Sequence, residues 1–418
     1  MFQRVLSSTR YIQKSTDYNF LIPWLKEGLL TSSGMKWHTR RKILTPTFHF
    51  KILEDYLPVF NRNTAVLVKI LRENMNKPFI EINNFITLCT LDIICESAMG
   101  ANINAQKGKE VEYVRAVQRI SELFQQRQLR IWLYNDTIFK FSSLGREQRK
   151  VLNILHGFSS KIIQQRRADY LACTNNLDII EQRVDKKRQL AFLDRLIEIS
   201  EKERELTDLD IREEVDTFMF EGHDTTSSAL SWAIHLLGAH PHVQERVVEE
   251  LKDIFGDCDH QPTYENLGQM RYLEQVIKET LRLYPSVPAF SRQLQADTEI
   301  MSVSVGYNVP AGANVTIPLF ILQRDPQLYP DPNKFDPDRF SLEAMQSRPP
   351  YCFLPFSAGP RGCIGQRFGI MELKVVLSTI LRNFRIESLD KTEDITVLME
   401  LILRPKNPLR IKLHPRKT

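Results

Sequence analysis

The chain has 418 residues, of which 42% are hydrophobic and 26% are charged, which is the composition of a globular protein with a large core. This composition excludes a disordered chain, and the net charge of +5 gives no general basis for binding nucleic acid. No segment has the ~20 consecutive apolar residues that a membrane-spanning helix needs, and the first residues lack the apolar core of a secretory signal.

Helix-spaced apolar residues, separated by breaks at proline and glycine, run along most of the chain and predict a mainly α fold. Near the amino end, Tyr18 to Leu30 is rich in aromatic and aliphatic residues, so it forms either part of a core or a surface that rests on a membrane. The charged run Glu181 to Arg188 predicts a solvated loop or an exposed helix face. Thr207 to Gly238 is the clearest helix, with a capping start, an acidic first turn and a glycine stop.

The residues after 283 change in character, because prolines become dense and β-branched residues alternate. Short strands are predicted there, including Ile300 to Val305 and Val315 to Ile317. Gln366 to Phe384 has apolar residues on most faces, which predicts a buried helix. At the carboxyl end a hairpin is predicted, in which Leu398 to Leu403 pairs with Leu409 to Leu413 across a proline-rich turn.

A glycine-rich loop around Cys363 carries the strongest chemical signal. It reads Phe-Ser-Ala-Gly-Pro-Arg-Gly-Cys-Ile-Gly from 356 to 365 and lies at the start of the predicted buried helix. Glycines let backbone amides approach the sulfur, while Arg361 and the amino terminus of the helix add positive potential. The Cys363 thiolate is therefore stabilised and available as a metal ligand.

The same loop resembles the haem-binding loop of the cytochromes P450, through the pattern F-x-x-G-x-R-x-C-x-G at Phe356, Gly359, Arg361, Cys363 and Gly365. The resemblance implies a mainly α cytochrome P450 fold, with many helices around a buried haem b and small β-sheets toward the carboxyl-terminal half. It also implies that the Cys363 thiolate is the axial ligand of the iron and favours O–O cleavage. The expected activity is that of a haem-thiolate monooxygenase, which uses O2.

The middle of the long helix reads EGHDTT from 221 to 226, where a glycine and two β-branched residues are poor helix formers. This local weakness predicts a functional groove with a widened turn, in which Asp224 and Thr225 pass protons that support oxygen activation. The segment resembles the distal helix of P450 family 4, which implies that Glu221 can form an ester with a haem methyl group. A hydrogen-bonded carboxylate is the alternative for Glu221.

Glu279 and Arg282 stand three residues apart, so a helix places both on one side as a charge-assisted pair. The pair matches the E-x-x-R motif of the P450 family, and Arg339 lies in a matching Pro-Asp-Arg-Phe string. The resemblance implies that Glu279, Arg282 and Arg339 form a structural triad behind the haem loop.

Trp37 and Arg41 are one helical turn apart, and the resemblance places them against a haem propionate. Arg292 and Arg361 match two further propionate-binding positions, and a buried dianionic cofactor needs such cations. The chain departs from the family at Gln323, where a histidine is usual, so we expect one contact to the propionate to be replaced or lost, with weaker haem retention.

Because motifs from Trp37 to Cys363 converge on one cofactor, we expect residues 1–418 to form a single catalytic domain that lacks the family's amino-terminal membrane anchor region. The resemblance implies an apolar substrate (a fatty acid, another lipid or a xenobiotic) and electrons from an NADPH-dependent flavoprotein reductase. It also implies a place at the cytosolic face of the endoplasmic reticulum membrane, in contact with the membrane surface. Arg40, Lys42 and Arg367 either line a docking face for an acidic reductase or are solvated surface charges.

Two other functions stay open on the sequence. One is a haem-binding sensor or carrier without oxygenase activity, against which the presence of Asp224 and Thr225 argues. The other is a non-catalytic truncated fragment, which a cooperative melt would distinguish from both.

Overall fold

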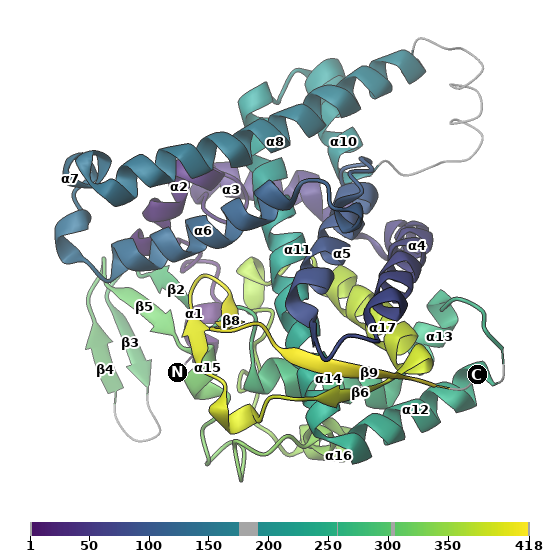
Figure 1. Cartoon of the computed structure of the whole chain (residues 1–418). Coiled ribbons are helices and arrows are strands. Elements are labelled where there is room, and N and C mark those ends of the chain that lie inside the picture. Colours follow the sequence, from purple (N-terminus) through teal and green to yellow (C-terminus); the bar gives the residue numbers. More distant parts are fainter. Residues whose placement is uncertain (1, 175–190, 257, 302–305, 417–418) are drawn as a thin grey trace. The chain divides into compact units, whose positions relative to one another are not determined.

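Helices make up most of the chain, as the spacing of the apolar residues predicts. The computed structural model describes residues 2–174, 191–256, 258–301 and 306–416. The α-helices are α1 (Phe2–Leu6), α2 (Ile22–Leu25), α3 (Gly34–Leu44), α4 (Phe50–Asn74), α5 (Ile82–Ser97), α6 (Val111–Gln128), α7 (Asp136–Phe141), α8 (Ser143–Thr174), α10 (Phe192–Glu198), α11 (Asp208–Ala239), α12 (Pro241–Phe255), α13 (Tyr264–Gln269), α14 (Arg271–Leu283), α15 (Leu319–Leu322), α16 (Leu342–Gln346) and α17 (Gln366–Asn383) (Figure 1). The shorter helical turns are η1 (Thr16–Leu21), η2 (Thr45–Phe48), η3 (Ala105–Lys107), η4 (Ile131–Leu133), η5 (Ile199–Glu203), η6 (Pro337–Phe340), η7 (Gly359–Arg361) and η8 (Thr392–Asp394).

The long helix α11 begins and ends within one residue of its prediction. At its start the Thr207 hydroxyl accepts the Asp210 N–H at 3.3 Å, while the Asp210 carboxylate accepts the Thr207 N–H at 2.9 Å, so each residue caps the other. At its end Pro241 begins α12. The whole stretch from 208 to 239 is α-helical, so the predicted widened turn in EGHDTT is not present.

The strands form small antiparallel sheets, and most of them lie in the carboxyl-terminal half. The strands are β1 (Ile80–Glu81), β2 (Phe290–Gln293), β3 (Thr298–Met301), β4 (Gly306–Val309), β5 (Asn314–Ile317), β6 (Phe384–Ser388), β7 (Val397–Met399), β8 (Leu403–Pro405) and β9 (Arg410–Pro415). They pair as β1–β9–β6, β2–β5, β3–β4 and β7–β8. Residues 302–305 of one predicted strand and the charged run Glu181 to Arg188 lie outside the described residues.

The predicted carboxyl-terminal hairpin is wrong in its pairing. Strand β7 pairs with the neighbouring β8, with Met399 opposite Leu403, whereas β9 pairs on its two edges with β1 and β6 (Figure 1). Pro405 and Pro408 have no N–H to donate, so the ladder cannot continue through the turn between β8 and β9. Strand β9 instead uses its alternation to bury Ile411 and Leu413 in a sheet made of distant segments.

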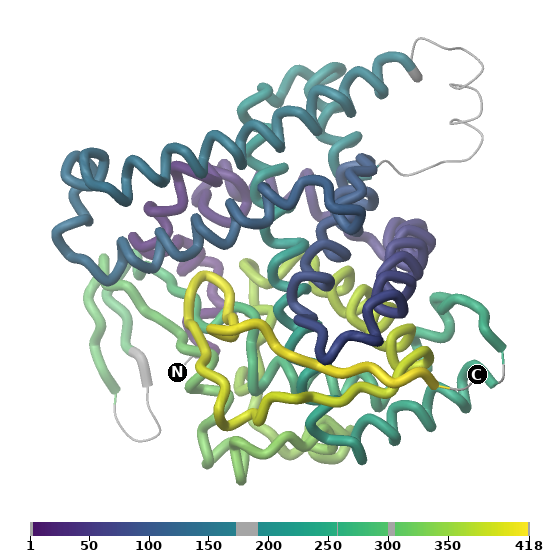
Figure 2. Tube along the Cα trace, in the orientation of Figure 1, coloured from purple at the N-terminus to yellow at the C-terminus, as the bar shows by residue number. Residues whose placement is uncertain are grey.

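The described chain divides into two compact units. Unit 1 comprises Met1–Thr16, Phe60–Cys89 and Asp224–Thr418, and unit 2 comprises Asp17–Val59 and Thr90–His223. In unit 1 the buried helix α17 packs against α12 and α14, and the Phe60 and Phe368 rings meet edge to face at 4.9 Å. In unit 2 helices α6 and α8 lie side by side (Figure 2), with the Tyr113 and Phe158 ring centroids 4.3 Å apart.

Part of the apolar stretch Tyr18 to Leu30 lies in the core of unit 2. Leu21, Trp24 and Leu25 are buried, and the Trp24 ring lies 4.6 Å from that of Phe220 on α11. These side chains are therefore not on a membrane-facing surface, because aromatic packing inside the unit already covers them. Across the described parts of the chain, each helix is too short or too polar to span a bilayer.

Candidate active site

Cys363 lies in unit 1 with its side chain exposed, on a tight loop that immediately precedes α17. The loop is closed by the Cys363 N–H, which donates to the Phe356 carbonyl at 2.9 Å. Gly359 has φ +69°, and a Cβ there would come within 1.9 Å of the Leu6 carbonyl oxygen, so a side chain cannot be accommodated. At Gly365 a Cβ would lie 4.0 Å from the Cys363 sulfur, which is ordinary van der Waals contact, so the close approach that requires glycine is at Gly359. Gly359 thus fixes the shape of a loop on which the Cys363 thiol is accessible to a ligand.

Two arginines of unit 1 approach the segment that follows α1. Arg361 donates from Nε to the Ile12 carbonyl at 2.8 Å, and Arg292 on β2 forms a backbone bridge with Lys14. Arg292 is only 2% exposed, and its Nη1 donates to the Ser291 carbonyl at 3.0 Å. A guanidinium in such a place is a group that binds carboxylates by charge-assisted hydrogen bonds, and a haem propionate is such a carboxylate. An accessible thiol with one buried and one half-buried guanidinium in the same unit is a donor set that fits a haem.

Glu279 and Arg282 come together in unit 1, as their spacing predicts, and Arg339 lies beside Glu279, as the family resemblance implies. Arg282 is fully buried, and it donates from Nε and Nη2 to the two Glu279 oxygens at 2.7 and 2.8 Å. Arg339 Nε lies 3.5 Å from Glu279 Oε1. The remaining Arg282 donors reach three backbone carbonyls, those of Gln323, Pro332 and Lys334. All five N–H groups of this guanidinium are therefore satisfied.

Gln323, which stands where a histidine is usual in the resembled family, is buried and hydrogen-bonds to two separate segments. Its Nε2 donates to the carbonyls of Leu281 and Arg282 at 3.0 and 3.1 Å. Its Oε1 accepts the Leu354 N–H at 3.0 Å, just before the cysteine loop. The amide thus joins the end of α14 to the backbone that leads to Cys363, a role that the sequence did not reveal.

The EGHDTT segment of α11 differs from its prediction at Gly222. In unit 2 a Cβ at this position would lie 2.6 Å from the Ile94 side chain, so the glycine admits a close approach of α5. The weak helix former therefore serves helix packing. Glu221 is half-buried, and Thr225 is half-buried with its carbonyl accepting the Ser286 hydroxyl at 2.7 Å in unit 1.

Asp224 has a partner that the sequence did not indicate. It is buried in unit 1, and both of its carboxylate oxygens accept hydrogen bonds from Nη2 of Arg404 on β8. Arg404 belongs to none of the motifs described above. It lies 180 positions from Asp224 in the chain, so no local spacing indicates that the two residues meet. The predicted proton-transfer acid is therefore one half of an ion pair.

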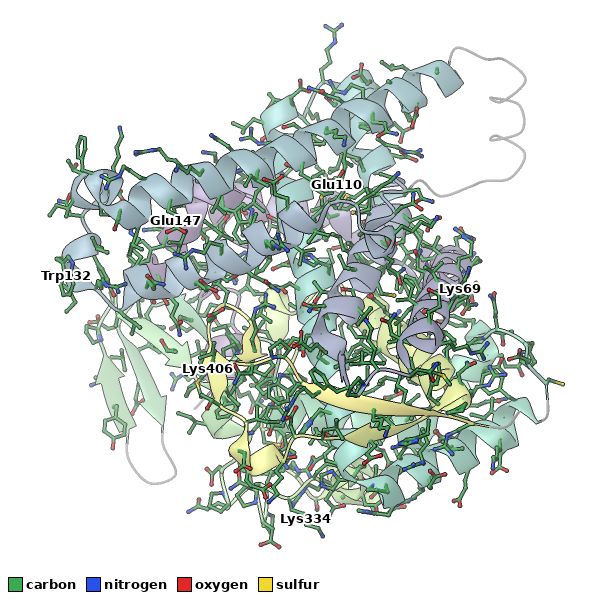
Figure 3. The ribbon with its side chains drawn as sticks, in the orientation of Figure 1. Lys69, Glu110, Trp132, Glu147, Lys334 and Lys406 are labelled. Atoms are coloured by element: carbon green, nitrogen blue, oxygen red, sulfur yellow. The ribbon has the colours of Figure 1, made fainter. Side chains whose placement is uncertain are left out.

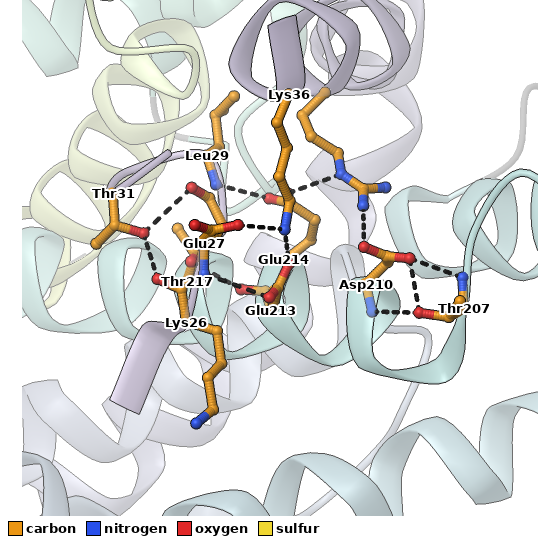
Figure 4. Close-up of polar contacts among 12 residues, drawn as sticks. Lys26, Glu27, Leu29, Thr31, Lys36, Thr207, Asp210, Glu213, Glu214 and Thr217 are labelled. Atoms are coloured by element: carbon orange, nitrogen blue, oxygen red, sulfur yellow. Dashed lines mark hydrogen bonds and ion pairs between the residues drawn. The ribbon is translucent and has the colours of Figure 1, made fainter. Parts of the chain in front are cut away.

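Helix α3, which carries Trp37 and Arg41, is fixed to α11 within unit 2 by two basic side chains. Lys36 Nζ lies 2.8 Å from a Glu213 carboxylate oxygen and 3.1 Å from a Glu27 carboxylate oxygen. Figure 4 draws both contacts. Arg40, one turn further on, pairs with Asp210 and lies 3.7 Å from Glu214. Residues four apart share a helix face, so this pairing also sets the direction of the next face, on which Trp37 and Arg41 lie.

The position of Arg40 corrects its expected role. The side chain is only 6% exposed, and it is engaged by the acids of α11. A buried, paired guanidinium cannot line a docking surface for a reductase. Lys42 and Arg367, by contrast, are exposed.

Glu214 makes the stability of the protein depend on pH. Burial raises the pKa of Glu214 from 4.5 to about 8, although the Leu29 N–H and the charge of Arg40 oppose the rise. A carboxyl with a raised pKa binds more protons in the folded state, so its contribution to stability falls as the pH rises from 4.5 through about 8. We expect Glu214→Gln to stabilise the protein by a few kcal/mol at about pH 8.5 and to have little effect at about pH 5. Thermal melts of the two proteins across this pH range measure the difference.

Glu27→Gln is the matched control, because Glu27 pairs with Lys36 at the exposed edge of the same cluster. Removal of the Glu27 carboxylate is expected to lower the free energy of unfolding by less than about 1 kcal/mol at either pH. A Glu214→Gln effect that does not change with pH would contradict the assignment of a raised pKa to Glu214.

An exposed apolar cluster lies on the segment between α6 and α8. The cluster consists of Leu129, Ile131, Trp132, Tyr134, Ile138 and Phe141. Trp132 on η4 points away from the ribbon in Figure 3. An exposed apolar patch of this kind marks an interaction site or a membrane contact. This cluster, rather than Tyr18 to Leu30, offers unit 2 an apolar surface.

Comparison with known proteins gives consistent matches along almost the whole chain. The family model described as Cytochrome P450 matches residues 1–413. Cytochrome P450 4c3 of Drosophila melanogaster is 50% identical over 99% of this chain and 78% of its own length. Cytochrome P450 4V2 of Homo sapiens is 49% identical over 99% of this chain and 78% of its own length. Cytochrome P450 4d1 of Drosophila melanogaster is 42% identical, with 99% of this chain and 81% of that protein covered.

Proposed function

Because the chain belongs to the cytochrome P450 family, whose members are haem-thiolate monooxygenases, we propose that it hydroxylates a fatty acid or a related lipid near the chain end. A xenobiotic of similar apolarity is the second substrate class. The accessible Cys363 thiol on its glycine-rich loop is the observation that supports this reaction best. We also propose that residues 1–418 act as one catalytic domain.

Haem b would be the cofactor, its iron would be held by the Cys363 thiolate, and Phe356 closes the ligand loop through its carbonyl. When bound, the haem supplies an iron centre that activates O2 for insertion of one oxygen atom into a C–H bond. Arg292 and Arg361 of unit 1 hold a propionate by charge-assisted hydrogen bonds. Trp37 and Arg41 of unit 2 have the same role, and α3 is held for it by Lys36 and Arg40.

Asp224 and Thr225 supply protons to the reaction in this proposal. The overall conversion consumes O2, two electrons and two protons, and it yields a hydroxylated product and water. In this proposal the proton passes through the Asp224 carboxylate and the Thr225 hydroxyl. Glu279, Arg282 and Arg339 act at a distance, by fixing the backbone behind the cysteine loop.

Glu221 is proposed to anchor the cofactor through an ester with a haem methyl group. The half-buried carboxylate precedes Asp224 by three positions on α11, which puts both acids on neighbouring parts of the helix surface. Such a bond would keep the haem attached when the chain is denatured.

The electron donor is proposed to be an NADPH-dependent flavoprotein reductase, with Lys42 and Arg367 among the exposed cations available to it. The protein is proposed to work at the cytosolic face of the endoplasmic reticulum membrane. The exposed cluster from Leu129 to Phe141 supports contact with the membrane surface, because apolar side chains beside the exposed Lys140 suit an interface with anionic lipid.

The test of this function combines the purified protein with a microsomal flavoprotein reductase, NADPH and dodecanoic acid. We expect a hydroxylated fatty acid that carries one atom from labelled O2, and a denatured chain whose intact mass includes haem. Haem binding without product from fatty acids or apolar xenobiotics would favour the sensor or carrier. Failure to bind haem, together with a non-cooperative melt, would favour the truncated fragment.

A further inference from the structure

Arg404 and Asp224 form a buried ion pair that lies outside every sequence motif. Asp224 is 1% exposed and the Arg404 side chain is 17% exposed. Arg404 Nη2 donates to both carboxylate oxygens, at 2.5 Å in the case of Oδ1. A buried charge pair of this kind has a strong effect when one partner is removed, because the other charge stays buried without compensation.

The strand that carries Arg404 is itself attached to α11. Ser228 lies one helical turn after Asp224, and its hydroxyl donates to the Leu403 carbonyl at 2.7 Å. Consecutive residues of β8 thus contact the same face of α11, through the backbone of Leu403 and the side chain of Arg404. This attachment fixes where the guanidinium meets the Asp224 carboxylate.

A second acid stands within reach of the same guanidinium. Glu400 lies in the turn between β7 and β8, and its Oε2 is 3.9 Å from Arg404 Nε. That Nε is buried, and it has no hydrogen-bond partner among the residues that the structure describes. Arg404 therefore has one acid that it holds by hydrogen bonds and another at ion-pair distance.

We propose that Arg404 is a positioning residue for Asp224, and that Glu400 is the carboxylate to which its guanidinium turns when Asp224 accepts a proton. The inference rests on the proposed role of Asp224 in supplying protons. A protonated Asp224 attracts the cation less, and Glu400 then keeps the buried guanidinium compensated. When Asp224 passes the proton on, its carboxylate is charged again, the original pair with Arg404 forms again, and the three residues return to their starting charge.

Arg404→Gln in the haem-loaded protein tests the positioning role. With reductase, NADPH and dodecanoic acid, we expect the product formed per NADPH to fall at least about tenfold, because proton delivery is worth that much or more. Hydrogen peroxide release should rise in proportion. When hydrogen peroxide replaces O2 and NADPH, the conversion of substrate and peroxide to hydroxylated product and water consumes no further electrons or protons. The defect should then shrink to less than about twofold, and Arg404→Lys should recover part of the NADPH-driven coupling.

Arg410→Gln is the matched control, since it removes an exposed arginine that pairs with Asp390 at 2.6 Å on the neighbouring sheet. It is expected to behave as the unaltered protein with both oxidants. Glu400→Gln tests the second acid: it should slow NADPH-driven turnover about threefold, raise its solvent isotope effect and leave the peroxide-driven rate unchanged.

The outcomes separate this inference from the proposed function. Unaltered protein that gives no product with either oxidant contradicts the proposed function. An active unaltered protein with an equally coupled Arg404→Gln variant overturns the positioning role, as does a variant that loses both reactions equally after correction for haem content. Glu400→Gln that matches the unaltered protein in every measurement overturns the role of Glu400.

Discussion

Cys363→His is expected to abolish NADPH-driven oxygenation while the chain still binds some haem. Imidazole ligates haem iron but donates less electron density than a thiolate, so the assistance to O–O cleavage is lost. We expect turnover to fall by a factor on the order of 10³ or more, as it does when other groups at a reacting centre are replaced. The carbon monoxide difference spectrum of the reduced protein measures the ligand directly, and its band should move from the thiolate-type to the neutral-ligand position.

Cys258→Ser is the matched control, because Cys258 is also an exposed cysteine of unit 1. It should retain both the thiolate-type band and the activity. A thiolate-type band that persists in Cys363→His would assign the ligand to another cysteine. The glycines around Cys363 would then need a different explanation from support of a ligand loop.

The features that the sequence predicted well are those in which local spacing sets the geometry. Glu279 and Arg282 are three apart on one helix, so forming α14 is enough to bring them together. The bounds of α11 follow from its caps, since Thr207 and Asp210 satisfy each other's backbone groups at its start. Membership of the P450 family and the mainly α fold follow from motifs of this local kind.

The features that the sequence did not predict depend on contacts between distant segments. Arg404 meets Asp224 across 180 residues, and Gln323 reaches backbone groups of α14 and of Leu354, which no side-chain pattern encodes. Arg40 looked like a surface charge because sequence gives the charge of a residue but not its burial. The prediction of a carboxyl-terminal hairpin was wrong because the partners of β9 come from segments that sequence does not show to be neighbours.

Arg282→Ala is expected to destabilise the fold by about 3–5 kcal/mol, because it leaves the buried Glu279 carboxylate without its partner. The substitution also removes the donors to the carbonyls of Gln323, Pro332 and Lys334. Typical domains have only about 5–15 kcal/mol of stability, so most of the protein should be recovered insoluble or without haem. Soluble yield, haem content per chain and the melting temperature measure this effect. Arg282→Lys should recover little, since an ammonium group offers three donors where five acceptors are arranged around a planar fork.

Lys278→Ala on the same helix separates this effect from a general cost of removing a cation. Lys278 pairs with Glu274 at 2.8 Å, and both side chains are partly exposed, so the loss is expected to be less than about 1 kcal/mol. If Arg282→Ala has the same melting temperature as Lys278→Ala, then water must enter and solvate the Glu279 carboxylate. In that case the five hydrogen bonds of Arg282 do not hold the backbone behind Cys363. If only Arg282→Ala loses haem, the E-x-x-R pair stabilises the cofactor site without touching the cofactor, through the carbonyls that its guanidinium binds.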